Sequence, residues 1–120
     1  MEKSAIIDIV KKDFAKRFRV IDNTTSAKKA VGGIFPDIIL MRPIPPENDD
    51  ILFIMRIESG KNMIDSAVEW RAMSNSPAGA YVIVPEAYIS EAKKIANAAG
   101  IRIRFASLIV KGKEPKIRYE

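Results

Sequence analysis

The stretch "PDIILMRPIPPENDDILFIMRIES", Pro36 to Ser59, decides the fold. Two apolar runs rich in β-branched residues, 36–41 and 51–58, flank a polar segment that holds three prolines. Proline lacks a backbone N–H and fixes φ, so this segment is excluded from a helix or sheet interior. Two strands joined by such a loop predict an antiparallel hairpin.

An acidic residue lies at the outer end of each strand of this hairpin: Asp37 begins the first strand and Glu58 ends the second. In an antiparallel pair, residues equidistant from the loop centre face each other, so we expect these two carboxylates to lie opposite, with Cβ atoms about 5 Å apart. Like charges at such positions destabilise a sheet. The pair therefore requires a compensating divalent cation, a shared proton or a nearby base, and Mg²⁺ is the natural cation for oxygen ligands.

The alternation of side chains along the second strand offers a structural alternative. Arg56 and Glu58 share one face of this strand, about 7 Å apart along it. A buried pair of these two residues, joined by Asp37, would form an ion cluster that holds the fold without any metal.

The segments around the hairpin predict a mixed sheet flanked by helices, in the order α-β-β-β-α-β-α-β. Helical spacing of apolar residues appears in 3–18, in 60–76 and in 86–100, where Gly100 closes the helix; further strands are expected at 18–26, 80–85 and 101–110. The strand at 80–85 is continuously apolar, as expected for a strand buried on both faces. We predict one α/β domain over residues 1–120, with a polar tail at about 111–120.

Two of the helices have apolar stripes that predict their buried faces. In the first helix the stripe consists of Ile7, Val10, Phe14 and Phe18. In the second it consists of Ile64, Ala67, Val68 and Arg71, with Asn62 as the expected N-cap, and Trp70 is expected in the core or lining a groove.

Composition narrows the chemistry. The 120 residues contain no cysteine and no histidine, which excludes disulfides, thiolate nucleophiles and Ser-His arrangements. No segment has the ~18 continuous apolar residues of a membrane span, so we expect a cytoplasmic protein without membrane contact. The net charge of +5 is compatible with a polyanionic partner and equally with an ordinary soluble protein.

The hairpin with "PDIIL" and "RIES", followed by a helix and "AYVIVPE", resembles the PD-(D/E)XK nuclease superfamily, which has the restriction-endonuclease-like fold. The resemblance covers about residues 6–84. It implies that Asp37 and Glu58, helped by the carbonyl of Ser59, ligate Mg²⁺ or Mn²⁺, and that a first-helix acid, Asp8 or Asp13, assists.

The chain departs from this family at its motif lysine, whose position is occupied by Gly60. In the family this lysine orients or activates the attacking water. Lys61 and Arg56 are the substitutes that we consider, although arginine cannot act as a general base because it does not deprotonate in proteins. It could still stabilise charge on a phosphate.

Basic residues elsewhere are candidates for nucleic-acid contacts. Arg102 and Arg104 alternate with apolar residues, and Lys11 and Lys12 lie off the apolar stripe of the first helix. Each set could equally be a solvated outer face. The sequence thus favours a degenerate nuclease-like domain that binds DNA or a protein partner, ahead of an active Mg²⁺-dependent endonuclease and ahead of a structural homodimer module; a homodimer is the expected assembly.

Overall fold

The computed structural model describes residues 1–25, 29–43, 50–112 and 114–120. Their elements follow the order α1 (Lys3–Phe14), β1 (Arg19–Asp22), β2 (Ile38–Met41), β3 (Ile51–Ile57), α2 (Met63–Ser74), β4 (Gly79–Pro85), the 3-10 turn η1 (Glu86–Tyr88), α3 (Ile89–Ala98), β5 (Arg104–Ile109) and β6 (Lys116–Tyr119). The chain is an α/β protein with a mixed sheet, as the sequence predicts.

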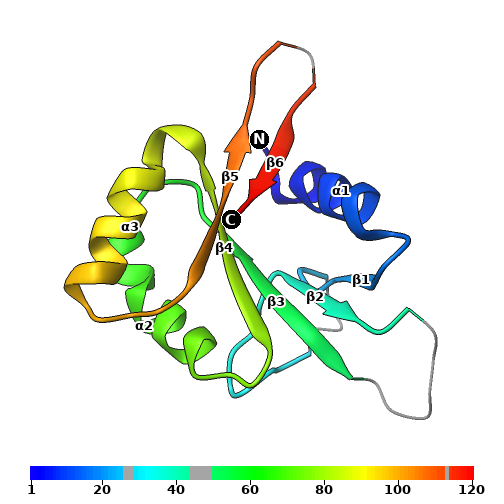
Figure 1. Ribbon diagram of the computed structural model, residues 1–120, viewed down its shortest axis with the longest axis horizontal. Helices are drawn as coiled ribbons and strands as arrows, with labels where there is room; N and C mark the ends of the chain where they lie inside the picture. The colour runs from blue at the N-terminus through cyan, green and yellow to red at the C-terminus, as the bar shows by residue number, and fades with distance from the viewer. Residues whose placement is uncertain (26–28, 44–49, 113) are drawn as a thin grey trace.

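The six strands form one curled sheet in which sequence order equals spatial order (Figure 1). β1, β2 and β3 pair antiparallel, β3, β4 and β5 pair parallel, and β6 returns antiparallel to β5. Each parallel step needs a crossover, and α2 and α3 supply the two. Both helices therefore lie on one face of the sheet, and α1 covers part of the other (Figure 1).

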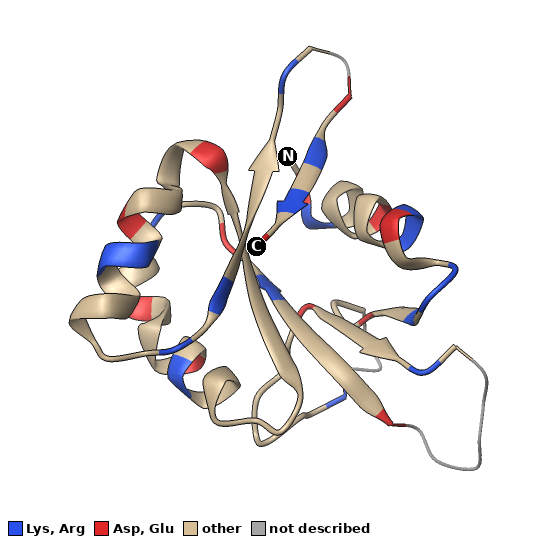
Figure 2. Cartoon of the chain, in the orientation of Figure 1, with Lys and Arg blue, Asp and Glu red and all other residues tan. Residues whose placement is uncertain are grey.

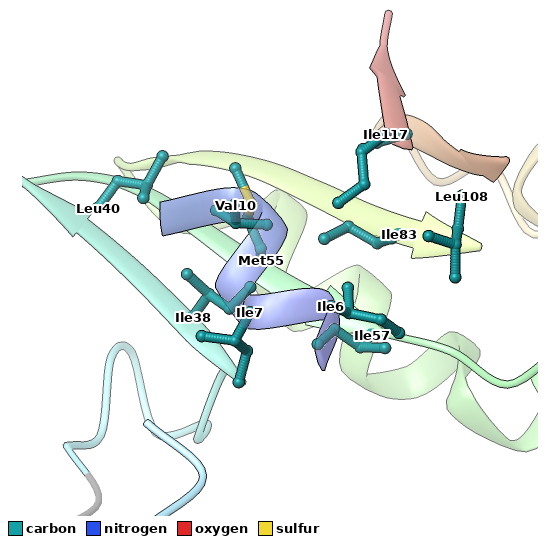
Figure 3. Close-up of a cluster of buried hydrophobic side chains, with 11 residues drawn as sticks. Ile6, Ile7, Val10, Ile38, Leu40, Met55, Ile57, Ile83, Leu108 and Ile117 are labelled. Carbon is teal, nitrogen blue, oxygen red and sulfur yellow. The ribbon is translucent and has the colours of Figure 1, made fainter. Parts of the chain in front are cut away.

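The core on the α1 face is formed by the apolar stripe of α1 and by side chains of the sheet. Ile7 and Val10 are buried against Ile38, Met55 and neighbouring strand residues (Figure 3). Phe14 and Phe18 of the same stripe pack at the margin of this cluster, which confirms the predicted face of α1.

The core on the opposite face lies under α2 and α3. Trp70 and Phe105 meet there edge-to-face, with ring centroids 5.5 Å apart, and Trp70 is fully buried. β4 faces both cores: Ile83 contacts the α1 cluster, whereas Val82 and Val84 contact the α2–α3 cluster. The prediction that this continuously apolar strand is buried on both sides is confirmed.

The predicted buried face of α2 is wrong. Ile64 and Val68 are 72% and 77% exposed, while the residues of α2 that are buried are Met63, Ser66, Trp70 and Met73. α2 has apolar residues around its whole circumference, so spacing alone did not identify the face that packs. Asn62 does precede the helix, but its side chain makes no capping hydrogen bond.

Residues 111–120, which the sequence predicts to be a polar tail, contain β6. Only Ile117 of this strand is buried, and Tyr119 is half-buried, so a four-residue strand carries too short an alternation to be recognised. β6 pairs with β5 and thereby covers an edge that would otherwise be exposed.

Candidate functional site

The hairpin register differs from the expected one by two residues. Ile38 faces Met55 and Leu40 faces Phe53; the ladder ends at Ile38, and the N–H of Asp37 donates to the carbonyl of Met55. The pairing follows the apolar residues that share the α1 core, and a shift by two keeps every side chain on its face. The expectation that Asp37 and Glu58 lie directly opposite was therefore wrong; β3 ends at Ile57, one residue before Glu58.

Asp37 continues the sheet where the β2–β3 ladder ends. Its backbone N–H donates to the Met55 carbonyl, and its carbonyl accepts from the Asn23 N–H. Its carboxylate Oδ2 then accepts the Ile57 N–H at 2.7 Å, and Oδ1 pairs with the Lys3 ammonium at 3.0 Å. The side chain is 13% exposed, so it satisfies an amide at the end of β3 that has little access to water.

Glu58 lies between the end of β3 and α2, and its side chain is 5% exposed. Oε1 accepts the Ser66 hydroxyl at 3.2 Å. Oε2 accepts the Trp70 indole N–H at 3.2 Å and the Arg56 Nε–H at 2.5 Å. Both oxygens of this buried carboxylate are thus occupied by donors of the protein itself.

Arg56 connects the buried carboxylate to the surface of α2. Besides Glu58 it pairs with Glu69, and its guanidinium also reaches the Ser66 hydroxyl at 3.4 Å. The Arg–Glu cluster that the alternation in β3 suggested is therefore present. It is completed by α2 residues, and Asp37 binds Lys3 and Ile57 instead.

The arrangement bears on the predicted Mg²⁺ or Mn²⁺ site. All four carboxylate oxygens of Asp37 and Glu58 accept hydrogen bonds, so a cation would have to displace Lys3 and Arg56. Within the described ranges, no group of three or more acidic, histidine or cysteine side chains is placed to hold a metal ion. These residues do not fit a metal site as they lie, and metal binding by Asp37 and Glu58 stays a prediction.

Gly60 occupies a place that no other residue fits without distortion. Its φ is +97°, and a Cβ there would lie 2.4 Å from Cδ2 of Tyr88. A lysine at the family position would therefore collide with this ring. The neighbouring candidates Ser59 and Lys61 are exposed, and the Lys61 N–H donates to the Ser59 hydroxyl at 3.3 Å.

The four predicted nucleic-acid contacts are all exposed. Arg102 and Arg104 line one depression of about 410 Å³ beside Met73–Ala80, and the Arg104 guanidinium also lies 5.9 Å from the centroid of the Tyr81 ring. Figure 2 shows that Lys and Arg are spread over α1, the segment after it, α2, α3, the start of β5 and β6, interspersed with Asp and Glu.

Lys11 and Lys12 have different surroundings. Lys12 lines a second depression, at the end of α1. Lys11 lies near Asp22, whose pKa is lowered chiefly by hydrogen bonds from the Thr24 hydroxyl and N–H, with a smaller contribution from the Lys11 charge. Although Lys11 and Lys12 both lie on α1, Lys12 lines this depression and Lys11 does not.

Sequence reasoning missed a ring of five aromatic side chains on the α1 face. In the order in which they touch, they are Phe14, Phe18, Phe53, Tyr81 and Tyr119. The only local signal is the four-residue spacing of Phe14 and Phe18, which places them on one side of the α1 end. The other three come from β3, β4 and β6, so they join the ring only through the sheet topology.

Tyr119 is fixed by the end of α1. Its hydroxyl donates to the Asp13 carboxylate at 2.9 Å. Burial, and then this hydrogen bond and the charge of Asp13, raise the pKa of the Tyr119 phenol well above its usual value. Asp13, a candidate for a first-helix metal ligand, is thus the partner of Tyr119; no contact of Asp8 contributes to this cluster.

Comparisons of the chain with models of protein families, with curated proteins and with solved structures found no match.

Proposed function

We propose that this chain is a nucleic-acid-binding domain of nuclease-like design in which the motif acids stabilise the fold. The observation that carries the proposal is the occupation of every carboxylate oxygen of Asp37 and Glu58 by a protein donor. Catalysis by a bound divalent ion requires carboxylate oxygens free to ligate it. Binding of a nucleic acid requires neither a metal ion nor the motif lysine, so a binding role is compatible with glycine at position 60.

The distribution of cations supports a polyanionic partner. Lys12, Lys16 and Arg17 gather around one depression at the end of α1, whose volume is about 640 Å³. Arg102 and Arg104 line another. Together with the net charge of +5, these clusters provide sites for phosphate contacts, which position a nucleic acid irrespective of its sequence.

A salt titration tests the proposal. Binding of fluorescently labelled single-stranded and duplex DNA would be measured by anisotropy from about 50 to 200 mM salt, where release of counterions makes affinity fall steeply. The double variant Lys12→Gln/Lys16→Gln should bind more weakly and lose about two units of the log–log salt slope. Lys94→Gln, an exposed change on α3, is the control for a lost charge and should bind like the wild type.

The same samples distinguish the alternatives. Incubation with Mg²⁺ or Mn²⁺ should leave the DNA intact; cleavage by the wild type that Asp37→Asn abolishes would overturn the proposal in favour of an active endonuclease. Absence of any DNA binding at low salt would reject it as well. Dimeric mass by sedimentation in that case would favour the structural homodimer module.

A further inference from the structure

The five side chains of the aromatic ring form a closed cycle, in which each aromatic group contacts two others. Neighbouring centroids are 4.9 to 6.1 Å apart, and the contacts run from Phe14 through Phe18, Phe53 and Tyr81 to Tyr119 and back to Phe14. All five side chains are only half-buried. α1 ends at Phe14, so these rings form the part of this sheet face that the helix leaves uncovered.

Four of the five aromatic side chains line a small apolar hollow. Its volume is about 180 Å³, and it is lined by Phe14, Phe18, Phe53, Tyr81 and Arg17, with Leu40 and Met55 as other lining residues. A drug-sized ligand needs about 300 Å³ or more, so the hollow suits a single planar group. The position of Phe53 is fixed closely: a Cβ on the facing Gly79 would lie 2.5 Å from its ring.

Cations surround this hollow, which decides what kind of planar group fits. Arg17 lines the hollow itself, and the Arg104 guanidinium lies over the ring of its Tyr81 wall, 5.9 Å from the ring centroid. The hollow also adjoins the cationic depression of Lys12 and Lys16, because Phe14 and Arg17 line both. One acid, Asp13, also lines the cationic depression, and its carboxylate accepts the Tyr119 hydroxyl.

An aromatic hollow beside a cationic depression matches the alternation of a nucleic-acid strand. Bases stack on aromatic side chains, while the phosphates follow a positively charged groove. A duplex keeps its bases stacked on one another, so only an unpaired base can enter. A cationic ligand, the other common occupant of aromatic rings, would be repelled by Arg17 and Arg104.

We infer that the hollow holds one unpaired base of a single-stranded nucleic acid, while Lys12, Lys16 and Arg17 contact the phosphates beside it. This inference rests on the proposed nucleic-acid binding and adds to it the form of the nucleic acid and the place where a base is held.

Strands with and without bases test the inference. Anisotropy would compare a short labelled single strand, the same strand with one central abasic site, the fully abasic strand and the duplex. The fully abasic strand should bind the wild type about tenfold more weakly than the base-bearing strand, because it keeps the phosphates and lacks the stacking partners. Phe18→Leu, which removes one wall ring and keeps an apolar side chain, should remove most of this difference.

Two further variants separate base from phosphate contacts. Arg17→Gln keeps all five aromatic rings. It should weaken binding of the base-bearing strand and of the fully abasic strand alike, and reduce the salt slope of both. Phe35→Leu changes an exposed aromatic residue outside the ring and should bind both strands like the wild type. Thermal melting of each variant shows whether it is folded, and Arg17→Gln, at an exposed position, tests the cationic half if Phe18→Leu does not fold.

Each outcome has one meaning. The inference is supported if the wild type binds the base-bearing strand more tightly than the abasic strand and Phe18→Leu removes this difference. It is also supported if this difference is present and Arg17→Gln lowers the affinity and the salt slope. Equal affinity for abasic and base-bearing strands overturns the inference that the hollow holds a base, and leaves the proposed nucleic-acid binding intact. Failure to bind any strand at low salt overturns both. Binding of a trimethylated lysine peptide in place of the strands would overturn both in favour of a cation site.

Discussion

At the scale of single residues, Glu58 shows how a buried acid contributes to the fold when no metal is bound. Its side chain is 5% exposed, and its charge is balanced by Arg56, while Ser66 and Trp70 satisfy the remaining hydrogen bonds. Removing one member of a buried ion pair leaves an uncompensated charge, which costs more than the pair itself contributes. Loss of Arg56 should therefore weaken the contact between β3 and α2, because Glu58 would stay buried without its charge partner.

The variant Arg56→Met should lower the free energy of unfolding by about 3 kcal/mol or more, because Glu58 stays buried without its partner. Glu69→Gln removes the outer carboxylate, which is half-exposed, and should cost about 1 kcal/mol or less. Urea denaturation of both variants measures this difference. Equal costs would show that the cluster acts as a surface network.

A second prediction at this scale concerns Gly60, where the PD-(D/E)XK motif that the sequence resembles has a lysine. Gly60→Ala combines a positive φ with a Cβ 2.4 Å from the Tyr88 ring, so it should lower the free energy of unfolding by about 3 kcal/mol. Gly100→Ala is the matched control: its φ of +67° is also positive, but no atom lies within 4 Å of the added Cβ, so it should cost about 1 kcal/mol. Chemical denaturation of both proteins separates the collision from the backbone cost.

At the scale of elements, the sequence predicts well wherever one periodicity covers a whole segment. α1, the β2–β3 hairpin and β4 have long, consistent patterns, and they form where expected. The predictions fail where packing against other elements decides which residues of a segment are buried. Ile64 and Val68 satisfy helical spacing as well as Met63 and Trp70 do, and only the position of α2 on the sheet determines which pair is buried.

The candidate site divides in the same way. The pairing of Arg56 with Glu58 follows from the alternation of β3, because Arg56 lies in the strand and Glu58 directly follows its last residue. The partners from α2, the register that separates Asp37 from Glu58, and the aromatic ring all depend on contacts between distant segments. Apart from the four-residue spacing of Phe14 and Phe18, a single sequence contains no local signal for them.

β6 provides the prediction at this scale, since its four residues were expected to be part of a polar tail. Ile117→Ala should lower the free energy of unfolding by about 2 kcal/mol, because Ile117 is buried against the α1 cluster. Lys116→Ala, on the same strand but exposed, should change it by about 0.5 kcal/mol or less. Thermal or urea melts of the two variants compare them. Similar small effects would show that β6 adds nothing to the stability of the sheet.

At the scale of the whole molecule, the aromatic ring joins the two ends of the chain. Phe14 and Asp13 come from the end of α1, Tyr119 comes from the last strand, and Phe53 and Tyr81 lie between them in the sheet. The ring thus spans the sheet from its antiparallel half to its C-terminal strand. The side chains that would bind a base therefore also connect the end of α1 to the sheet, beside the core contacts of Ile7 and Val10.

The protonation of Tyr119 makes this connection measurable. Burial and the Asp13 carboxylate raise the pKa of its phenol in the folded protein above the usual value of 10.0. The folded chain therefore keeps this proton at a pH where the unfolded chain has lost it. The unfolded state binds fewer protons above about pH 10, so stability contributed by this group is complete below that pH and falls as the pH rises further.

The loss should be specific to this residue. Between about pH 9 and 11, the free energy of unfolding of the wild type should fall more steeply than that of Tyr119→Phe, by up to about 1.4 kcal/mol per pH unit. Tyr88→Phe, which removes an exposed phenol outside the ring, should keep the steep dependence of the wild type. Urea midpoints at a series of pH values measure all three. Parallel curves for the wild type and Tyr119→Phe would mean that burial and the Asp13 carboxylate do not keep the Tyr119 phenol protonated in the folded protein.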